Sequence, residues 1–320
     1  MRAHRMRALL AALLLVSSTG IRARGQVATP TPPPTSPAPV AAAQTPANTE
    51  IYLARILHHG DSLVLTPPQN VTRRPGYDNQ PSFLIDASGF LYTAIGDDGQ
   101  ADIWRYDIVT RRRTRLTNTP ESEYSPTVMP GGTRFSVVRV ERDSTQRLWS
   151  FALDGSDPQL VLRVLKPVGY HAWLDAFRLA AYVLGNPSTL HVIRRDGSGD
   201  EERARDIGRA LQRIPGQQWY SFTQRDSTKA LWIMAQPFEG GDVSQLVRTP
   251  PDNEFYVWAP DGTLFSASHG SLVRWNGVSG EGSEWIPVAS LEAAKVKNVT
   301  RLAVSPDGKW LAFVAEPAGP

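Results

Sequence analysis

The 320-residue sequence contains no cysteine. This absence excludes a disulfide scaffold, a thiolate metal site, a cysteine nucleophile and a lipid-modified cysteine. The sequence also lacks an apolar run long enough for a membrane span, since residues 8–16 supply nine apolar residues where a transmembrane helix needs about 20. Charged residues make up 20% and apolar residues 41% of the chain, which is typical of a globular protein.

The motifs of several enzyme classes are missing as well. The chain contains no G-x-S-x-G nucleophile elbow, no H-E-x-x-H zinc motif, no EF-hand loop, no phosphate-binding glycine loop and no dinucleotide fingerprint. His58 and His59 are neighbours on a predicted strand, so they face opposite sides and do not chelate one ion together. A Ser-His-Asp set assembled from distant segments remains an open alternative, although no motif points to one.

The first 49 residues have the composition of an export signal followed by a linker. Residues 1–25 contain arginines but no acid, and a basic stretch precedes the apolar run, which is typical of a secretory signal peptide cleaved after Gly25 or Gly20. Residues 26–49 are rich in Pro, Ala and Thr and carry no charge, which favours an extended tether over a packed core. A Pro-rich ligand for a partner domain is the alternative interpretation of that segment.

The formal net charge of +3 arises from this leader. Five of the 34 basic residues lie in residues 1–25, so the remainder holds 29 basic residues against 31 acidic ones. The basic run at residues 111–115 fits an exposed hairpin, and no second basic cluster with interleaved aromatic residues accompanies it. We therefore expect an exported protein, periplasmic or extracellular, with no nucleic-acid partner.

From Glu50 onward the chain repeats. Helical periodicity is nearly absent, and short β-branched and aromatic runs alternate with Gly, Pro, Asp and Asn turns. Each repeat has an apolar anchor residue, a tight turn and a second apolar strand, followed by a third strand and a short fourth one. Four strands in a repeat of 41 to 46 residues are the signature of a β-propeller blade. The anchors are Phe83, Val128, Trp173, Ile214, Trp258 and Val304.

The repeat also predicts how the ring closes. Only 16 residues follow Val304, which is enough for one further strand beyond the turn. Residues 51–56 and 62–65 form two apolar strands ahead of the first anchor. The last blade is therefore predicted to take its outer strands from residues near Glu50, which removes the exposed edges of an open array. Six four-stranded blades in an all-β fold follow.

The residues of the turns carry a family resemblance. Residues 305–313 (SPDGKWLAF) resemble the SPDGK-x-IAF element of TolB-like six-bladed propellers, whose units are also called PD40 or WD40-like repeats. Residues 259–262 (APDG) are a second copy, and residues 103–107 (IWRYD) with Leu116 and Thr117 resemble the family's IW-x-x-D…LT half-blade. The resemblance spans residues 50–320 and implies a TolB-like propeller. The turns of blades three and four depart from the pattern, which leaves the register there open by a residue or two.

The loops that lead into the innermost strands supply the candidate site. In a propeller these loops converge near the mouth of the central channel, and here they are rich in carboxylates, amides and tyrosines. Oxygen ligands of this kind could hold Ca²⁺, and the same mixture could dock a peptide or a partner loop. The candidate residues are Tyr77, Asp78, Asn79, Glu123, Tyr124, Tyr170, His171, Asn253, Glu254 and Asn298.

The sequence thus predicts an exported, monomeric, non-enzymatic binding or scaffold module. Its partner is expected to be a protein or peptide bound at the channel mouth, with no catalytic residue and no required cofactor. The alternative is a Ca²⁺-dependent hydrolase or lactonase that uses an acidic central channel. Both rest on analogy of fold, which does not by itself determine function.

Overall fold

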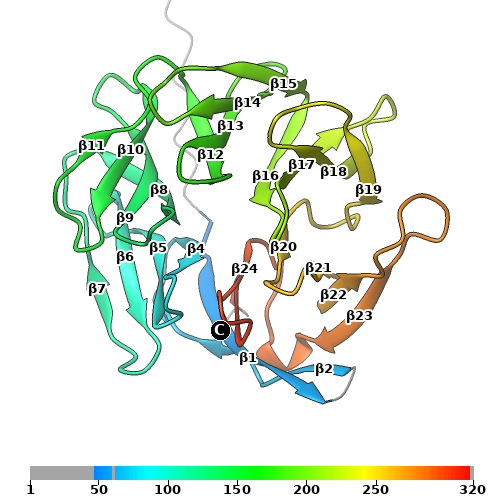
Figure 1. Cartoon of the computed structure of the whole chain (residues 1–320). Helices are drawn as coiled ribbons and strands as arrows, with labels where there is room; N and C mark the ends of the chain where they lie inside the picture. Colours follow the sequence, from blue (N-terminus) through cyan, green and yellow to red (C-terminus); the bar gives the residue numbers. More distant parts are fainter. Residues whose placement is uncertain (1–46, 60–61, 318–320) are drawn as a thin grey trace, which may run out of the picture. The chain divides into compact units, whose positions relative to one another are not determined.

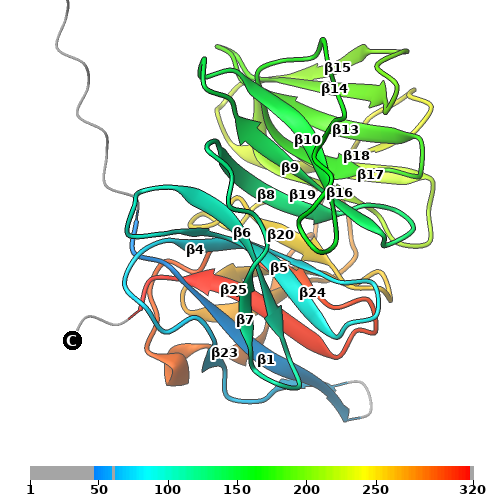
Figure 2. The ribbon, with the colours of Figure 1, turned by 90° about the vertical axis from the view of Figure 1, so that its left-hand side faces the viewer.

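The structure is a computed structural model that describes residues 47–59 and 62–317. The strands form six antiparallel sheets arranged as blades around a central channel, which confirms the predicted all-β, six-bladed propeller (Figure 1). Figure 2 shows the same blades after a 90° rotation. The predicted signal peptide and almost all of the predicted linker lie outside the described residues. Within the described part, no helix has the length and apolar character needed to cross a membrane.

Five blades are continuous in sequence, and each runs from the channel outward. Blades one to three contain β4 (Asp78–Phe83), β5 (Gly89–Ile95), β6 (Ala101–Asp107) and β7 (Arg113–Arg115); β8 (Ser122–Val128), β9 (Arg134–Val140), β10 (Gln146–Ala152) and β11 (Gln159–Leu160); and β12 (Val168–Trp173), β13 (Arg178–Val183), β14 (Thr189–Arg194) and β15 (Glu201–Arg205). Blades four and five contain β16 (Ile207–Arg213), β17 (Trp219–Arg225), β18 (Leu231–Pro237) and β19 (Ser244–Arg248); and β20 (Tyr256–Trp258), β21 (Leu264–Ser268), β22 (Ser271–Trp275) and β23 (Trp285–Ser290), which the single-turn η1 (Glu292–Ala294) follows.

The sixth blade joins the two ends of the propeller sequence, as predicted. Its inner strands are β24 (Leu302–Val304) and β25 (Trp310–Ala315), and its outer strands are β1 (Glu50–His59), β2 (Ser62–Leu65) and β3 (Gln69–Asn70). Strand β1 pairs with β25 from Glu50↔Ala315 to Arg55↔Trp310. Both β2 and β3 pair with β1, so two short strands share the position of the fourth strand. Backbone hydrogen bonds between segments more than 250 residues apart therefore close the ring.

Alternating side chains on each strand hold neighbouring blades together. In β5, Phe90 and Tyr92 are buried in a cluster with Ile51 and Val314 of blade six. Leu91, which points to the opposite face, is buried with Phe135 of blade two. Because successive residues of a strand face opposite sides, one apolar strand contributes to two blade interfaces at once. This geometry explains why the strands are continuously apolar.

The repeated turns owe their shape to local hydrogen bonds. In the turn of blade six, Ser305 Oγ donates to Asp307 Oδ1 over 2.6 Å, and the Trp310 N–H donates back to Ser305 Oγ over 2.9 Å. Gly308 adopts a φ of 69°, a conformation that glycine tolerates at no steric cost. The S-P-D-G sequence is therefore a turn with a local chemical cause, which is why the repeat is visible in the sequence.

The fourth anchor lies one residue earlier in the chain than predicted. The anchors Phe83, Trp258 and Val304 pair with Phe90, Leu264 and Leu311. The equivalent pair in blade four is Arg213↔Tyr220, so the fourth anchor is Arg213 and not Ile214. The apolar pattern points to Ile214 because this residue directly follows the strand, whereas the residue that faces the channel at this level is an arginine.

Candidate functional site at the central channel

The innermost strands of all six blades line one cavity of about 390 Å³. Its lining runs from the residues three positions before the anchors to the anchors themselves, so the cavity follows the channel along these strands. The first layer comprises Gln80, Ser125, Tyr170, Ala210, Phe255 and Arg301, with Arg209 beside it. The far layer comprises the anchors Phe83, Val128, Trp173, Arg213, Trp258 and Val304. The pseudo-symmetric ring therefore brings one side chain from each blade to each level of the channel.

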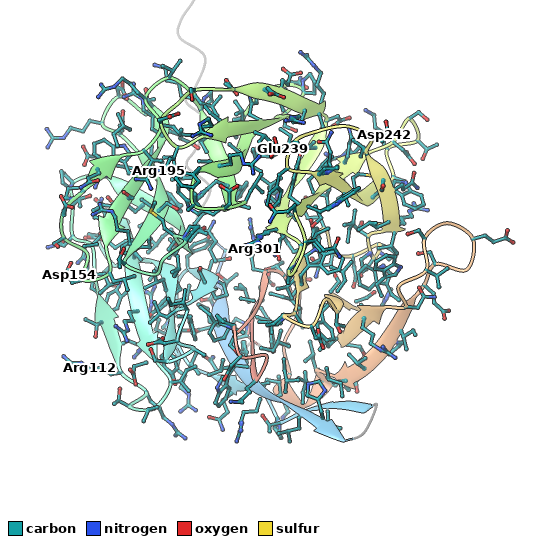
Figure 3. All side chains as sticks on the ribbon, viewed as in Figure 1. Arg112, Asp154, Arg195, Glu239, Asp242 and Arg301 are labelled. Atoms are coloured by element: carbon teal, nitrogen blue, oxygen red, sulfur yellow. The ribbon has the colours of Figure 1, made fainter. Side chains whose placement is uncertain are left out.

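Arg301 dominates the first layer. Its guanidinium carbon lies 3.9 Å from the centre of the Phe255 ring and 4.6 Å from that of Tyr170. Arg301 directly precedes β24 of blade six. Tyr170 belongs to blade three, on the opposite side of the ring, so the arginine side chain extends across the channel. Figure 3 shows Arg301 near the centre of the ring of blades. We call Arg301, Tyr170 and Phe255 together the arginine site.

The charge of Arg301 has no partner of opposite sign among the described residues. The nearby carboxylate of Glu254 forms an ion pair with Arg209, over 2.5 Å from Arg209 Nε to Glu254 Oε1. Arg301 instead makes two cation–π contacts, and burial lowers its pKa although Tyr170 and Tyr77 act in the opposite direction. Together with Arg209 and Glu254, the arginine site therefore contains two guanidinium groups and one carboxylate, and it carries an excess positive charge.

Tyrosines surround the arginine site on the side where the innermost strands begin. Tyr77 precedes β4, and Tyr124 lies in β8 one residue before the first layer. Burial raises the pKa of Tyr77 to about 12 against the opposing effect of Arg301, and burial also raises that of Tyr124. Both phenols stay protonated at neutral pH and can donate hydrogen bonds. This end of the channel, with Tyr77, Tyr124, Arg209 and Glu254, is the channel mouth.

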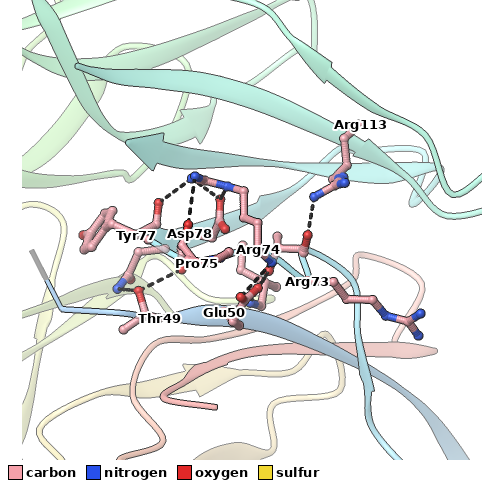
Figure 4. A network of polar contacts seen from close by, with 12 residues as sticks. Thr49, Glu50, Arg73, Arg74, Pro75, Tyr77, Asp78 and Arg113 are labelled. Atoms are coloured by element: carbon pink, nitrogen blue, oxygen red, sulfur yellow. Dashed lines mark hydrogen bonds and ion pairs between the residues drawn. The ribbon is translucent and has the colours of Figure 1, made fainter. Parts of the chain in front are cut away.

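The acidic residues expected at the mouth are instead used in structural contacts. Asp78 is fully buried, and its Oδ1 accepts a hydrogen bond from Arg74 Nη2 over 2.9 Å (Figure 4). Glu123 is fully buried and accepts from Arg139 Nε over 3.1 Å. Burial raises the pKa of Asp78 to about 6, with Arg74 opposing the shift, and raises the pKa of Glu123 as well. Neither carboxylate is among the residues that line the channel cavity.

Of the ten predicted residues, the structure places Tyr77, Tyr170 and Glu254 near Arg301, and Tyr124 near Tyr77. Asn253 is buried, and its side chain bonds the Phe255 N–H and the Val299 carbonyl. Asn79 is buried beside Thr49, while Asn298 lies exposed at a positive φ of 50° in the loop before β24. Arg209, Phe255 and Arg301 are missing from the predicted set, although counting three residues back from Trp258 and Val304 would have reached the last two.

These side chains do not fit a calcium site. Ca²⁺ is held by several oxygen ligands, carboxylates prominent among them. The described residues contain no group of three or more His, Asp or Glu side chains placed to hold a metal ion. Asp78, Glu123 and Glu254 already pair with Arg74, Arg139 and Arg209, and the excess positive charge at Arg301 repels cations.

His171 lines the channel and contacts a buried serine of blade two, and this pair is structural. Ser136 Oγ lies 2.6 Å from His171 Nε2, and Trp173 Nε1 donates to the same oxygen over 2.9 Å. Both members are buried, burial lowers the pKa of His171 to about 3, and His171 Nδ1 has no partner among the described residues. The histidine therefore lacks the carboxylate that orients a catalytic imidazole.

The same bridge recurs between blades four and five without a histidine. Ser221 Oγ accepts hydrogen bonds from Trp258 Nε1 and from the Tyr256 hydroxyl, each over 2.9 Å. Tyr256 occupies the position of His171, two residues before the anchor tryptophan. A tyrosine hydroxyl there makes the contact that the imidazole makes at Ser136, so the two serines form equivalent links between blades. The open alternative of a catalytic triad gains no support from it.

Comparison with known proteins identifies the class of fold. No protein-family model matches the chain. A structure assigned to TolB from Agrobacterium tumefaciens gives a TM-score of 0.63 at 13% identity and covers 84% of this chain and 98% of that chain. TolB from Acinetobacter baumannii gives 0.56 at 12% identity and covers 84% of this chain and 64% of that chain, so this chain spans less than two thirds of that protein.

A gluconolactonase from Xanthomonas campestris is also similar, with a TM-score of 0.55 at 12% identity over 86% of this chain and 99% of that chain. At such identities the likeness shows the fold alone. The protein is thus a six-bladed β-propeller whose fold is similar to that of TolB, and the same architecture occurs in an enzyme among its structural neighbours. The choice between binding and catalysis depends on the site.

Proposed function

We propose that this propeller is an exported, non-enzymatic binding module that engages a protein or peptide partner at the channel mouth. The observation that carries the proposal is the arginine site, where an arginine with no acidic partner among the described residues lies over two aromatic rings in the channel. Arginine and aromatic side chains are enriched in protein interfaces and at their energetic hot spots. The neutral phenols of Tyr77 and Tyr124 add hydrogen-bond donors at the rim of the same site.

Export is proposed from residues 1–25, whose basic, apolar and small-residue segments follow the order of a signal peptide. The propeller is proposed to act as a monomer, which light scattering coupled to size exclusion tests. The calcium-dependent hydrolase is not proposed, since the carboxylates that it would need are paired with Arg74, Arg139 and Arg209.

A photo-crosslinking experiment tests the proposal. A photoreactive amino acid replaces Tyr124 at the mouth, and in a matched control it replaces Thr114, which is exposed on β7 at the outer edge of blade one. After irradiation of intact cells, the proposal expects a discrete adduct from position 124 that is absent from position 114. The partner, identified by mass, should bind the purified protein, and Arg209→Ala should weaken that binding at least tenfold.

Arg209 suits this test because about half of its side chain is exposed and its loss leaves the core intact. Adducts that are identical from positions 124 and 114, or none from 124, would remove the mouth as a docking site. A partner that binds equally well to Arg209→Ala would do the same.

A further inference from the structure

The arginine site has a property that partner binding in general does not require. Arg301 has its guanidinium carbon over two aromatic rings and forms no ion pair among the described residues, so its N–H groups remain available to a ligand. In-plane N–H groups are the part of arginine that forms paired hydrogen bonds with carboxylates and phosphates. The residue also lines the cavity of about 390 Å³, so a ligand inside the channel can reach it.

The charge balance selects the kind of anion. Glu254 compensates Arg209, which leaves Arg301 as the positive charge of the first layer without a partner among the described residues, while Arg213 lies in the far layer. One carboxylate neutralises one guanidinium, whereas a phosphate dianion would leave a negative charge in a buried channel. A cavity of about 390 Å³ lies near the lower end of the range for ligand sites, so it takes a single side chain or a chain end and not a folded domain.

We propose that Arg301 is the receptor for one carboxylate of the bound ligand, an Asp or Glu side chain or a free C-terminus of a peptide inserted along the channel axis. The peptide source rests on the proposed function, while the carboxylate rests on the arginine site itself. Tyr170 and Phe255 act as positioning residues that hold the guanidinium across the channel. The apolar anchors Trp173 and Trp258 provide the walls against which the rest of the inserted segment packs.

Nuclear magnetic resonance of arginine Nε–Hε groups tests this directly on the full chain. The Arg301 signal is assigned as the one lost in Arg301→Lys. Titration with N-acetyl-Gly-Asp-Gly-amide should shift that signal saturably, and the asparagine analogue should bind at least tenfold more weakly. Arg301→Lys should weaken the aspartyl peptide about tenfold because it loses the paired geometry, and Arg301→Gln should abolish detectable binding, both followed through the tryptophan fluorescence of the channel.

Controls separate a local effect from a loss of fold. Arg112→Gln removes the same charge from the outer edge of blade one (Figure 3) and should leave binding unchanged. The thermal midpoints of the Arg301 variants are measured alongside. Binding lost in Arg301→Gln but kept in Arg301→Lys at a similar midpoint would support the proposal even if both variants were less stable.

The outcomes are distinct. Equal binding of the aspartyl and asparaginyl peptides, an Arg301 signal that does not move, or tighter binding of inorganic phosphate at equal ionic strength would overturn carboxylate recognition. Tighter binding of galacturonate than of the aspartyl peptide would retain the carboxylate and overturn its peptide source. A crosslinked partner whose affinity ignores Arg301→Gln would leave the proposed function standing and reject this inference.

Discussion

Burial of Asp78 at the start of the first innermost strand predicts an unusual dependence of stability on pH. Its side chain has no exposed surface, Oδ1 accepts from Arg74, and Oδ2 has no hydrogen-bond partner among the described residues. Removal from water disfavours the ionised form, and the arginine compensates only part of that cost. The pKa of Asp78 accordingly rises from 3.8 to about 6.

The sign of the effect follows from proton binding. Between pH 4 and pH 6 the folded protein holds a proton on Asp78 that the unfolded chain has released. Stability from this group is therefore fully present below pH 4 and is lost as the pH rises through about 6. The pKa difference corresponds to about 3 kcal/mol at 1.36 kcal/mol per pH unit. The side chain introduced by Asp78→Asn does not titrate. The free energy of unfolding of the variant should therefore rise by about 3 kcal/mol relative to that of the wild type as the pH increases from 4 to 7.5.

Urea unfolding at a series of pH values measures this difference. Asp196→Asn is the control, because hydrogen bonds from Ser198 lower the pKa of the exposed Asp196. Stability from a lowered pKa changes only as the pH falls below the ordinary value. The difference in free energy of unfolding between this control and the wild type should therefore be independent of pH across the same window. An Asp78→Asn variant whose free energy of unfolding does not rise relative to that of the wild type from pH 4 to pH 7.5, or falls relative to it, would refute the reasoning.

Three further changes test the packing. Phe313→Ala empties a fully buried position of the closing blade and should cost about 3–5 kcal/mol in urea unfolding, and a loss below 1 kcal/mol would mean that the site collapses around the cavity. Ser221→Ala leaves Trp258 Nε1 and the Tyr256 hydroxyl without their acceptor and should cost about 1–3 kcal/mol, whereas an unchanged midpoint would show that the bridge between blades contributes nothing. Gly308→Ala places a Cβ at a φ of 69° and should cost about 1 kcal/mol in the same assay, and a more stable variant would contradict the strain.

The architecture was predictable because its causes are local. The S-P-D-G turn at residues 305–308 closes on its own serine and aspartate, and such turns recur at nearly constant intervals. A regular interval of strands and turns leaves few folds other than a propeller. The register of blade four was the exception, because Arg213 is polar and an apolar neighbour, Ile214, took its place in the pattern.

The candidate site was predicted only in outline. The mouth lies where the loops into the innermost strands converge, and Tyr77, Tyr124 and Tyr170 are there as expected. The alternative of an acidic channel depended on two carboxylates of this set. Asp78 and Glu123 looked available in sequence, but Arg74 and Arg139 neutralise them below the surface, while Arg301 reaches the channel axis without an acidic partner among the described residues.

The sequence by itself thus determined the repeat, the number of blades and the closure by the strand at Glu50, since these follow from turn chemistry and the alternation of side chains along a strand. Only the tertiary structure decided which charged side chains form ion pairs and which do not. Arg301 and Tyr170 lie 131 positions apart in sequence and meet because blades three and six face each other across the ring. The sequence repeat does not predict a contact across the channel axis, because that contact depends on the closure of all six blades and on the direction of a single long side chain.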